Sequence, residues 1–307
     1  MRYTEDLQFM VLGPLEVRRG GELVPVAGRR EQAVLGMLLL ADGGLVSVDR
    51  LVEVVWDDPP RAAVKAVRNC VSVLRRALAE AGGPPGLIET TATGYRLLAG
   101  YCRLDAREFG RQVNAARRLA ATGQTVQAAT RLRAALSLWR GPALAGIGAG
   151  SLQACVVRLE EQRITALEEC LDLELALGQH GHVIAELRTL TREHPLRERT
   201  ASQLMLALYR SGRQAEALDT YRQLATRLAD ELGIDPAGEV TRLHQAMLRH
   251  DRGLDPGPLK AVAARLRPAS RPCRRRITVV HPSTTAKAGS PAAETRPDKE
   301  SGYASQQ

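Results

Sequence analysis

Aromatic residues and lysines are scarce in this chain of 307 residues. Phe, Trp and Tyr together make up 3% of the sequence, whereas hydrophobic residues make up 44%. The cores must therefore consist mainly of Leu, Val and Ala, which is typical of packed helices. The four lysines are Lys65, Lys260, Lys287 and Lys299, and none of them follows a GxxxxGK[ST] loop. The sequence therefore excludes a P-loop nucleotide site.

Metal-binding and catalytic patterns are also missing. The cysteines are scattered without a CxxC pair, at positions 70, 102, 155, 170 and 273, so we expect reduced thiols rather than a disulfide framework. His180 and His182 have no further ligand at a recognisable spacing, so we expect no metal and no other cofactor. The motifs G-x-S-x-G and H-E-x-x-H do not occur, so the chain is predicted not to be an enzyme.

Targeting and membrane-spanning segments are missing as well. There is no signal peptide and no apolar run near 18 residues, so we expect a cytoplasmic, nucleoid-associated protein without membrane contact. The first predicted strand begins near residue 7, so we expect no phosphoacceptor receiver domain before it.

The basic charge is concentrated near the C-terminus. The net charge is +9, and residues 1–101 hold 12 basic and 12 acidic side chains. Residues 102–250 hold 20 and 17, and residues 251–307 hold 11 and 5. The last segment is also rich in proline, so we expect a disordered, solvated tail that adds at most non-specific attraction to phosphate. Specific binding of DNA must depend on charges placed on individual helices.

The stretch 65–80, KAVRNCVSVLRRALAE, has the period of an amphipathic helix. Its apolar face is formed by Val67, Cys70, Val71, Leu74, Ala77 and Leu78. The opposite face carries four cations, an amide and a hydroxyl, from Lys65, Arg68, Asn69, Ser72, Arg75 and Arg76. Arg and Asn form paired hydrogen bonds with the edges of guanine and adenine. The helix is a candidate to enter the major groove, although a solvated helix face has the same pattern.

The segments around this helix predict a winged helix. Residues 7–26 alternate like short strands separated by Gly-Pro and Gly-Gly turns, which indicates a small antiparallel sheet. Helices are predicted over 29–41 and 48–56, the second with Ser47 as its N-cap. Together with the basic helix they have the order of a helix-turn-helix module, whose later helix reads DNA.

A hairpin over 87–98 follows the basic helix and is the predicted wing. Thr91, Thr93 and Arg96 are its candidates for holding the DNA backbone, although threonine is also common in ordinary strands. Arg29 and Arg30, at a helix N-terminus, are further candidates for phosphate contact. Within the basic helix we expect Arg68 and Asn69 to read bases, and Arg75 and Arg76 to hold phosphates.

Helical patterns dominate from Asp105 to His250 and contain an internal repeat. Gly178 and Gly212 are 34 residues apart, which is the tetratricopeptide period, and Gly123 begins a fainter third copy. Val183, Leu187 and Leu190 correspond to Ala217, Tyr221 and Leu224. We expect helix pairs that bury their apolar faces by stacking, with generic helical hairpins as the alternative.

Several segments in order resemble the Streptomyces antibiotic regulatory protein family. They are FMVLGPLEV at 9–17, LLLA at 38–41, DRLVEVVW at 49–56, VSVLRRAL at 71–78, TGYRL at 93–97, LWRGPAL at 138–144 and ADELGIDP at 229–236. The resemblance implies a mainly α chain with an OmpR-like winged helix over 1–101. It further implies a bacterial transcriptional activation domain of tetratricopeptide-like repeats over 102–250, before the tail at 251–307.

The resemblance also implies a function. Such proteins bind direct repeats in double-stranded promoter DNA, usually as two molecules side by side. They contact the sigma factor and alpha subunit of RNA polymerase and activate an antibiotic or other secondary-metabolite gene cluster. The loop with Asp57, Asp58 and Arg61, together with the repeat domain, is the expected polymerase-facing surface.

Two alternatives remain open from the sequence. In the first, the chain is a helical scaffold whose winged helix makes mainly protein contacts, and Arg68→Ala leaves its function intact. In the second, a small molecule in the repeat domain gates the regulator, and a pathway product shifts its melting temperature. Specific DNA binding instead predicts a steep dependence of affinity on salt.

Overall fold

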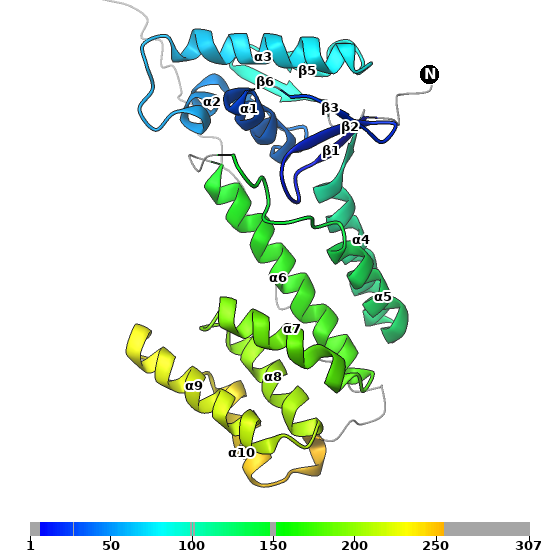
Figure 1. The fold of residues 1–307 in the computed structure, drawn as a ribbon, viewed down its shortest axis with the longest axis vertical. Helices are drawn as coiled ribbons and strands as arrows, with labels where there is room; N and C mark the ends of the chain where they lie inside the picture. The colour runs from blue at the N-terminus through cyan, green and yellow to red at the C-terminus, as the bar shows by residue number, and fades with distance from the viewer. Residues whose placement is uncertain (1–6, 27, 99, 101, 148–151, 255–307) are drawn as a thin grey trace, which may run out of the picture. The chain divides into compact units, whose positions relative to one another are not determined.

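The computed structural model describes residues 7–26, 28–98, 100, 102–147 and 152–254. The predicted tail lies outside these residues except for 251–254. The strands are β1 (Leu7–Met10), β2 (Glu16–Arg19), β3 (Glu22–Val24), β4 (Val46–Ser47), β5 (Ile88–Thr90), β6 (Gly94–Leu97) and β7 (Arg103–Leu104). The helices are α1 (Arg29–Leu40), α2 (Val48–Val55), α3 (Ala63–Glu80), α4 (Asp105–Ala121), α5 (Thr125–Leu136), α6 (Gln153–Ala176), α7 (His180–Glu193), α8 (Glu198–Arg210), α9 (Gln214–Leu232) and α10 (Gly238–Leu248), followed by the 3-10 turn η2 (Arg252–Leu254) (Figure 1). The predicted mainly α class is confirmed.

The predicted N-terminal antiparallel sheet is present and gains one strand. Its strand order is β3-β2-β1-β7, and Phe9 lies opposite Val17 in the antiparallel pair of β1 and β2. Strand β7 pairs in parallel with β1, opposite Gln8 and Phe9. The sequence did not predict β7, because a strand of two residues is too short to show an alternating pattern.

A second sheet, in the order β4-β6-β5, contains the predicted wing hairpin. Strand β4 was also missed, and it places Ser47 opposite Gly94. A side chain at position 94 would put its Cβ 1.9 Å from the carbonyl oxygen of Val46. Only glycine therefore allows this close approach of the two strands.

The three predicted helices of the N-terminal part are present as α1, α2 and α3. The apolar stripe of α1 is fully buried, with Val34, Leu35 and Leu38 each 0% exposed. Ser47 caps α2, since its hydroxyl accepts a hydrogen bond of 3.2 Å from the amide of Arg50. Helix α3 packs on both α1 and α2.

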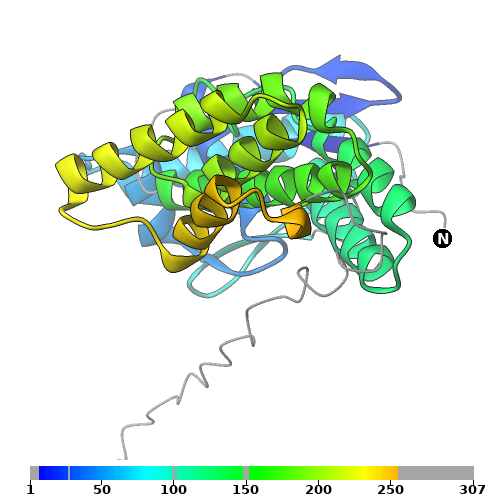
Figure 2. The ribbon, with the colours of Figure 1, turned by 90° about the horizontal axis from the view of Figure 1, so that it is seen from below.

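The three glycines of the predicted repeat lie in helical turns of the same geometry. Gly123, Gly178 and Gly212 have φ angles of +77°, +82° and +76° and follow α4, α6 and α8. In each turn the next amide donates to a carbonyl five residues earlier, over 2.9 Å from Gln124, 3.0 Å from Gln179 and 2.9 Å from Arg213. This Schellman closure requires a left-handed residue, which explains the recurring glycine. Figure 2 shows α9 and α10 side by side at the end of the repeat.

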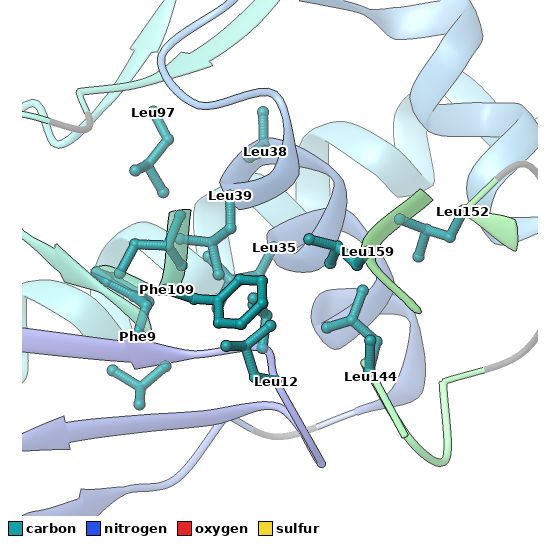
Figure 3. Packing of buried hydrophobic residues seen from close by; sticks show 14 of the residues in the cluster. Phe9, Leu12, Leu35, Leu38, Leu39, Leu97, Phe109, Leu144, Leu152 and Leu159 are labelled. Atoms are coloured by element: carbon teal, nitrogen blue, oxygen red, sulfur yellow. The ribbon is translucent and has the colours of Figure 1, made fainter. Parts of the chain in front are cut away.

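The hydrophobic core does not stop at residue 101, where the sequence placed a domain boundary. One continuous cluster extends from Leu7 in β1 to Leu173 in α6. Figure 3 shows Phe9 and Leu12 with Leu35 of α1, Phe109 of α4 and Leu144. A second cluster extends from Ile164 in α6 to Met247 in α10.

Hydrogen bonds reinforce this shared core where β1 ends. The buried carboxylate of Asp105, at the start of α4, accepts hydrogen bonds from the amides of Val11 at 2.9 Å and Leu12 at 3.0 Å. It also accepts one of 2.8 Å from Ala106. Burial raises the pKa of Asp105, while these amides and Arg140, 3.9 Å away, act to lower it. The amides thus offset part of the cost of burying a charge.

Segment 138–144 forms hydrogen bonds with the same residues directly after β1. The amide of Arg140 donates to the carbonyl of Leu12 at 2.8 Å, and the amide of Leu144 donates to that of Val11 at 3.0 Å. The Arg140 guanidinium bonds Glu16 at 2.6 Å and the Pro14 carbonyl at 3.1 Å. Two segments that carried the family resemblance, 9–17 and 138–144, are therefore in direct contact.

We predict that Asp105→Asn lowers the free energy of unfolding by about 3 kcal/mol, because the amide nitrogen of asparagine would face buried N–H donors that need an acceptor. Unfolding in urea, followed by circular dichroism, measures the change. The control is Asp42→Asn, which removes only an exposed ion pair with Arg107 and should cost less than about 1 kcal/mol. Equal costs for the two variants would contradict this role of Asp105.

Candidate nucleic-acid interface

Helix α3 has the two faces that the sequence predicts. Val67, Val71 and Leu74 are at most 1% exposed, and Cys70 and Leu78 are also buried. Ala77 is half-buried at the edge of this face. All six predicted DNA-facing residues are exposed: Lys65, Arg68, Asn69, Ser72, Arg75 and Arg76. The amphipathic packing is therefore observed, while contact with DNA stays a prediction.

Four of the six side chains are unengaged. Lys65, Arg68, Asn69 and Arg76 make no hydrogen bond, ion pair or ring contact with any other residue that the structure describes. The Ser72 hydroxyl instead donates to the carbonyl of Arg68 on the preceding turn, over 3.0 Å. Helix α3 therefore presents three unpaired cations and an amide to its surroundings.

Arg75 differs from this prediction, because its guanidinium is engaged by the wing. Nε and Nη2 donate to the Ile88 carbonyl at 3.0 and 2.7 Å, and Nη2 also bonds the Thr90 hydroxyl at 2.7 Å. The guanidinium lies 5.9 Å from the centre of the Tyr95 ring. We therefore reassign Arg75 from phosphate contact to attaching the hairpin to α3.

The wing residues also have intramolecular partners. Thr91 Oγ1 exchanges hydrogen bonds of 3.1 Å with the amide and carbonyl of Gly94, which closes the hairpin turn. Arg96 forms an exposed ion pair with Glu89 at 2.6 Å. Thr93 is exposed at the tip, and its side chain has no partner among the residues described. Of the three predicted wing contacts, Thr93 is the one with an unengaged side chain.

The side chains of Arg29 and Arg30 also have intramolecular partners. Arg29 Nη2 donates to the carbonyl of Gly146 at 3.2 Å. The Arg30 guanidinium lies over the Trp56 ring, 5.1 Å from its centre. The prediction of phosphate contact considered only the helix N-terminus, and it could not include these partners, which are distant in sequence.

The loop between α2 and α3 is exposed. Asp57, Asp58 and Arg61 are all accessible, and none has a side-chain partner in the described part of the chain. The structure thus leaves these side chains available, as the polymerase-contact prediction requires.

Sequence reasoning missed Val64. It is 40% exposed in the first turn of α3, one turn before Arg68. An apolar side chain at this position can pack against the methyl group of thymine in the major groove. The available signal was an apolar residue adjoining a face that is otherwise charged and polar.

The cysteine at the centre of α3 serves packing. Burial and the nearby Glu31 raise the pKa of the Cys70 thiol to about 12, and burial also raises that of Cys170 to about 12. Such thiols remain protonated near neutral pH and are poor nucleophiles.

In the part of the chain that the structure covers, no helix is long and apolar enough to span a membrane.

Comparisons with known proteins match both halves of the chain. A family model described as "Transcriptional regulatory protein, C terminal" matches residues 25–97. A second model, described as "Bacterial transcriptional activator domain", matches residues 104–248. Together the two models cover most of the described residues.

Curated relatives are named as regulatory proteins. Regulatory protein AfsR of Streptomyces coelicolor is 39% identical over 87% of this chain, but the match spans only 27% of AfsR. Regulatory protein DnrI of Streptomyces peucetius is 34% identical over 81% of this chain and 94% of DnrI. The structure of Mycobacterium tuberculosis EmbR in complex with a low affinity phosphopeptide is 36% identical with a TM-score of 0.77, covering 85% of this chain and 69% of that one.

We predict that Arg75→Ala lowers the free energy of unfolding by about 2 kcal/mol, because the Ile88 carbonyl loses a charged donor. Urea unfolding measures the loss, and hydrogen exchange should show faster opening of β5 and β6. Its neighbour Arg76 provides the matched control, since Arg76→Ala removes no intramolecular contact and should change stability by less than about 0.5 kcal/mol. The assignment fails if both alanine variants unfold at the same urea concentration.

Proposed function

The chain belongs to the Streptomyces antibiotic regulatory protein family of transcriptional regulators, and from this membership we propose that it activates a secondary-metabolite gene cluster. It would bind direct repeats in promoter DNA through α3 and the wing, and recruit RNA polymerase. The observation that carries the proposal is the exposed face of α3, on which Lys65, Arg68, Asn69 and Arg76 lack intramolecular partners. When such a face binds DNA, its cations neutralise phosphates and release the counterions of the DNA without first breaking intramolecular bonds.

In this proposal α3 lies in the major groove. The residues nearer its N-terminus read base edges, so Arg68 is assigned to guanine and Asn69 to adenine. Val64 packs on a thymine methyl group beside them. Arg76, two turns further along the helix, holds a phosphate, and Lys65 faces the groove or its flanking phosphates.

The wing supports this placement from the side. Thr93 at its tip contacts the sugar-phosphate backbone. Arg96 is already paired with Glu89, so any contribution to phosphate binding requires it to exchange that partner. Arg75 contributes indirectly, because it fixes the hairpin against α3.

Recruitment of polymerase is assigned to two surfaces. The loop with Asp57, Asp58 and Arg61 lies directly before α3 and is exposed, so a molecule bound to DNA would offer it to a neighbouring protein. The helical repeat supplies a second surface for the sigma factor or the alpha subunit. Two molecules bound side by side on direct repeats would present both surfaces twice.

We predict that Arg68→Ala weakens binding to a selected promoter site by 1–3 kcal/mol, or roughly 5- to 150-fold, and relaxes specificity at one base pair. Arg76→Ala should weaken binding to all sequences alike and reduce the slope of log K against log salt by about 1. Fluorescence anisotropy at several salt concentrations measures both effects.

The control for these variants is Arg242→Ala, which removes an exposed arginine from α10 and should leave affinity unchanged. If Arg68→Ala binds as well as the unmodified chain, the scaffold hypothesis is favoured over specific DNA binding. If the unmodified chain binds DNA only after addition of a pathway product, the ligand-gated hypothesis is favoured.

We predict that replacing one thymine of the selected site by uracil weakens binding roughly fourfold, since loss of a buried methyl group costs about 0.8 kcal/mol. Val64→Ala should bind the thymine site with a similar loss and should not distinguish thymine from uracil at that position. Anisotropy titrations of the two proteins on the two sites form a double-mutant cycle, which measures the interaction between Val64 and the thymine methyl group. An equal response of both proteins to every thymine replacement would rule out the contact.

A further inference from the structure

A groove of about 370 Å³ lies between α7, α8 and α9, outside the DNA-binding surface. It is lined by Arg188, Thr191, Arg192, Pro195, Leu204, Leu208, Glu216, Asp219, Thr220, Gln223, Leu224 and Arg227. Helix α8 packs closely on both α7 and α9, which contribute the two polar walls. Stacked helical hairpins commonly use such grooves to bind protein partners.

The floor of the groove is apolar. Leu204, Leu208 and Leu224 line it and are 5%, 1% and 3% exposed. The hydroxyls of Thr191 and Thr220 donate to backbone carbonyls of their own helices, each over 2.8 Å. Neither the leucines nor these two engaged hydroxyls therefore offer a free hydrogen-bond donor to a ligand.

The acidic groups of the groove already have cationic or amide partners. Glu216 accepts hydrogen bonds from Arg213 at 2.7 and 2.8 Å and forms an ion pair with Arg188. Asp219 pairs with Arg222 at 3.3 Å and accepts 2.6 Å from the Gln223 amide. Neither carboxylate is left to attract a basic ligand.

Two arginines of the groove, one on each wall, have no intramolecular partner in the described part of the chain. Arg192 on α7 and Arg227 on α9 are exposed and have no partner among the described residues. They are thus two available guanidinium groups on either side of an apolar floor. A guanidinium group binds a carboxylate through two parallel hydrogen bonds, which makes acidic side chains suitable ligands.

We propose that this groove binds an acidic peptide segment of a partner protein, with carboxylates on Arg192 and Arg227 and an apolar side chain over the leucines. The inference rests on the proposed function, because it locates one of the polymerase-facing surfaces on the helical repeat.

The residues of the groove argue against two other occupants. The chain's own tail, 251–307, has 11 basic and 5 acidic residues, so the free arginines would repel it. The residues that line the groove include no aromatic side chain on which the bases of a nucleic acid could stack.

The test uses the full chain and 15-residue peptides that tile the sigma factor and alpha subunit of Streptomyces coelicolor RNA polymerase. We expect the labelled protein to bind those peptides that have acidic residues on both sides of an apolar residue. Anisotropy with the strongest peptide should show about tenfold weaker binding for the double variant R192E/R227E, and similar weakening when the acidic residues of the peptide become glutamine.

The control is Arg158→Glu, which reverses an exposed charge on α6 outside the groove and should leave peptide affinity unchanged. Circular dichroism checks that all variants fold, and promoter binding is titrated in parallel. The inference is overturned if no tiled peptide binds, or if the double variant or the glutamine peptide binds as well as its parent. Loss of promoter binding by the unmodified chain would instead contradict the proposed function, whatever the groove does.

Discussion

The carboxylate of Asp105 is the interaction on which the placement of the two halves depends. Strand β1 ends at Met10, and the amides of Val11 and Leu12 need an acceptor that no neighbouring strand supplies. Asp105 meets both and begins α4 at the same position. Burial raises its pKa, and the hydrogen bonds from these amides act in the opposite direction. Segment 138–144 then closes over the same turn, and the sheet and the helices bury one core.

Helix α6 carries this continuity further. Leu159, Ala166 and Leu173 on one side of it belong to the core that includes α1 and α3. Ile164 and Leu171 belong to the second core, with α7, α8 and α9. A partner bound to the helical repeat would therefore act on an element that also packs with the DNA-binding half. Helix α6 thus connects the two cores through packed side chains.

Patterns within one element were readable from the sequence, whereas contacts between distant segments were not. Helical periodicity identified both faces of α3, and the glycine spacing identified the turns of the repeat, since each depends on residues close in sequence. Strand β7 and the partners of Arg29 depend on residues from about 95 to about 117 positions away. A local pattern contains no information about them. Val64 was missed for another reason, because an apolar residue next to a polar face does not fit the pattern of an amphipathic helix.

Because lysine is scarce, arginine provides both the intramolecular contacts and the unpaired positive charges of this chain. The sequence alone does not separate these two uses. Arg75 and Arg76 are adjacent, equally charged and both exposed, yet one is fixed by the Ile88 carbonyl and the other has no partner. The same contrast separates Arg188, paired with Glu216, from Arg192 one turn later. A guanidinium group that is already hydrogen-bonded must give up those bonds before it can bind a phosphate or a carboxylate, whereas an unpaired one gives up only water. The unpaired arginines of α3, α7 and α9 can therefore bind a phosphate or a carboxylate at a lower cost than the paired arginines beside them.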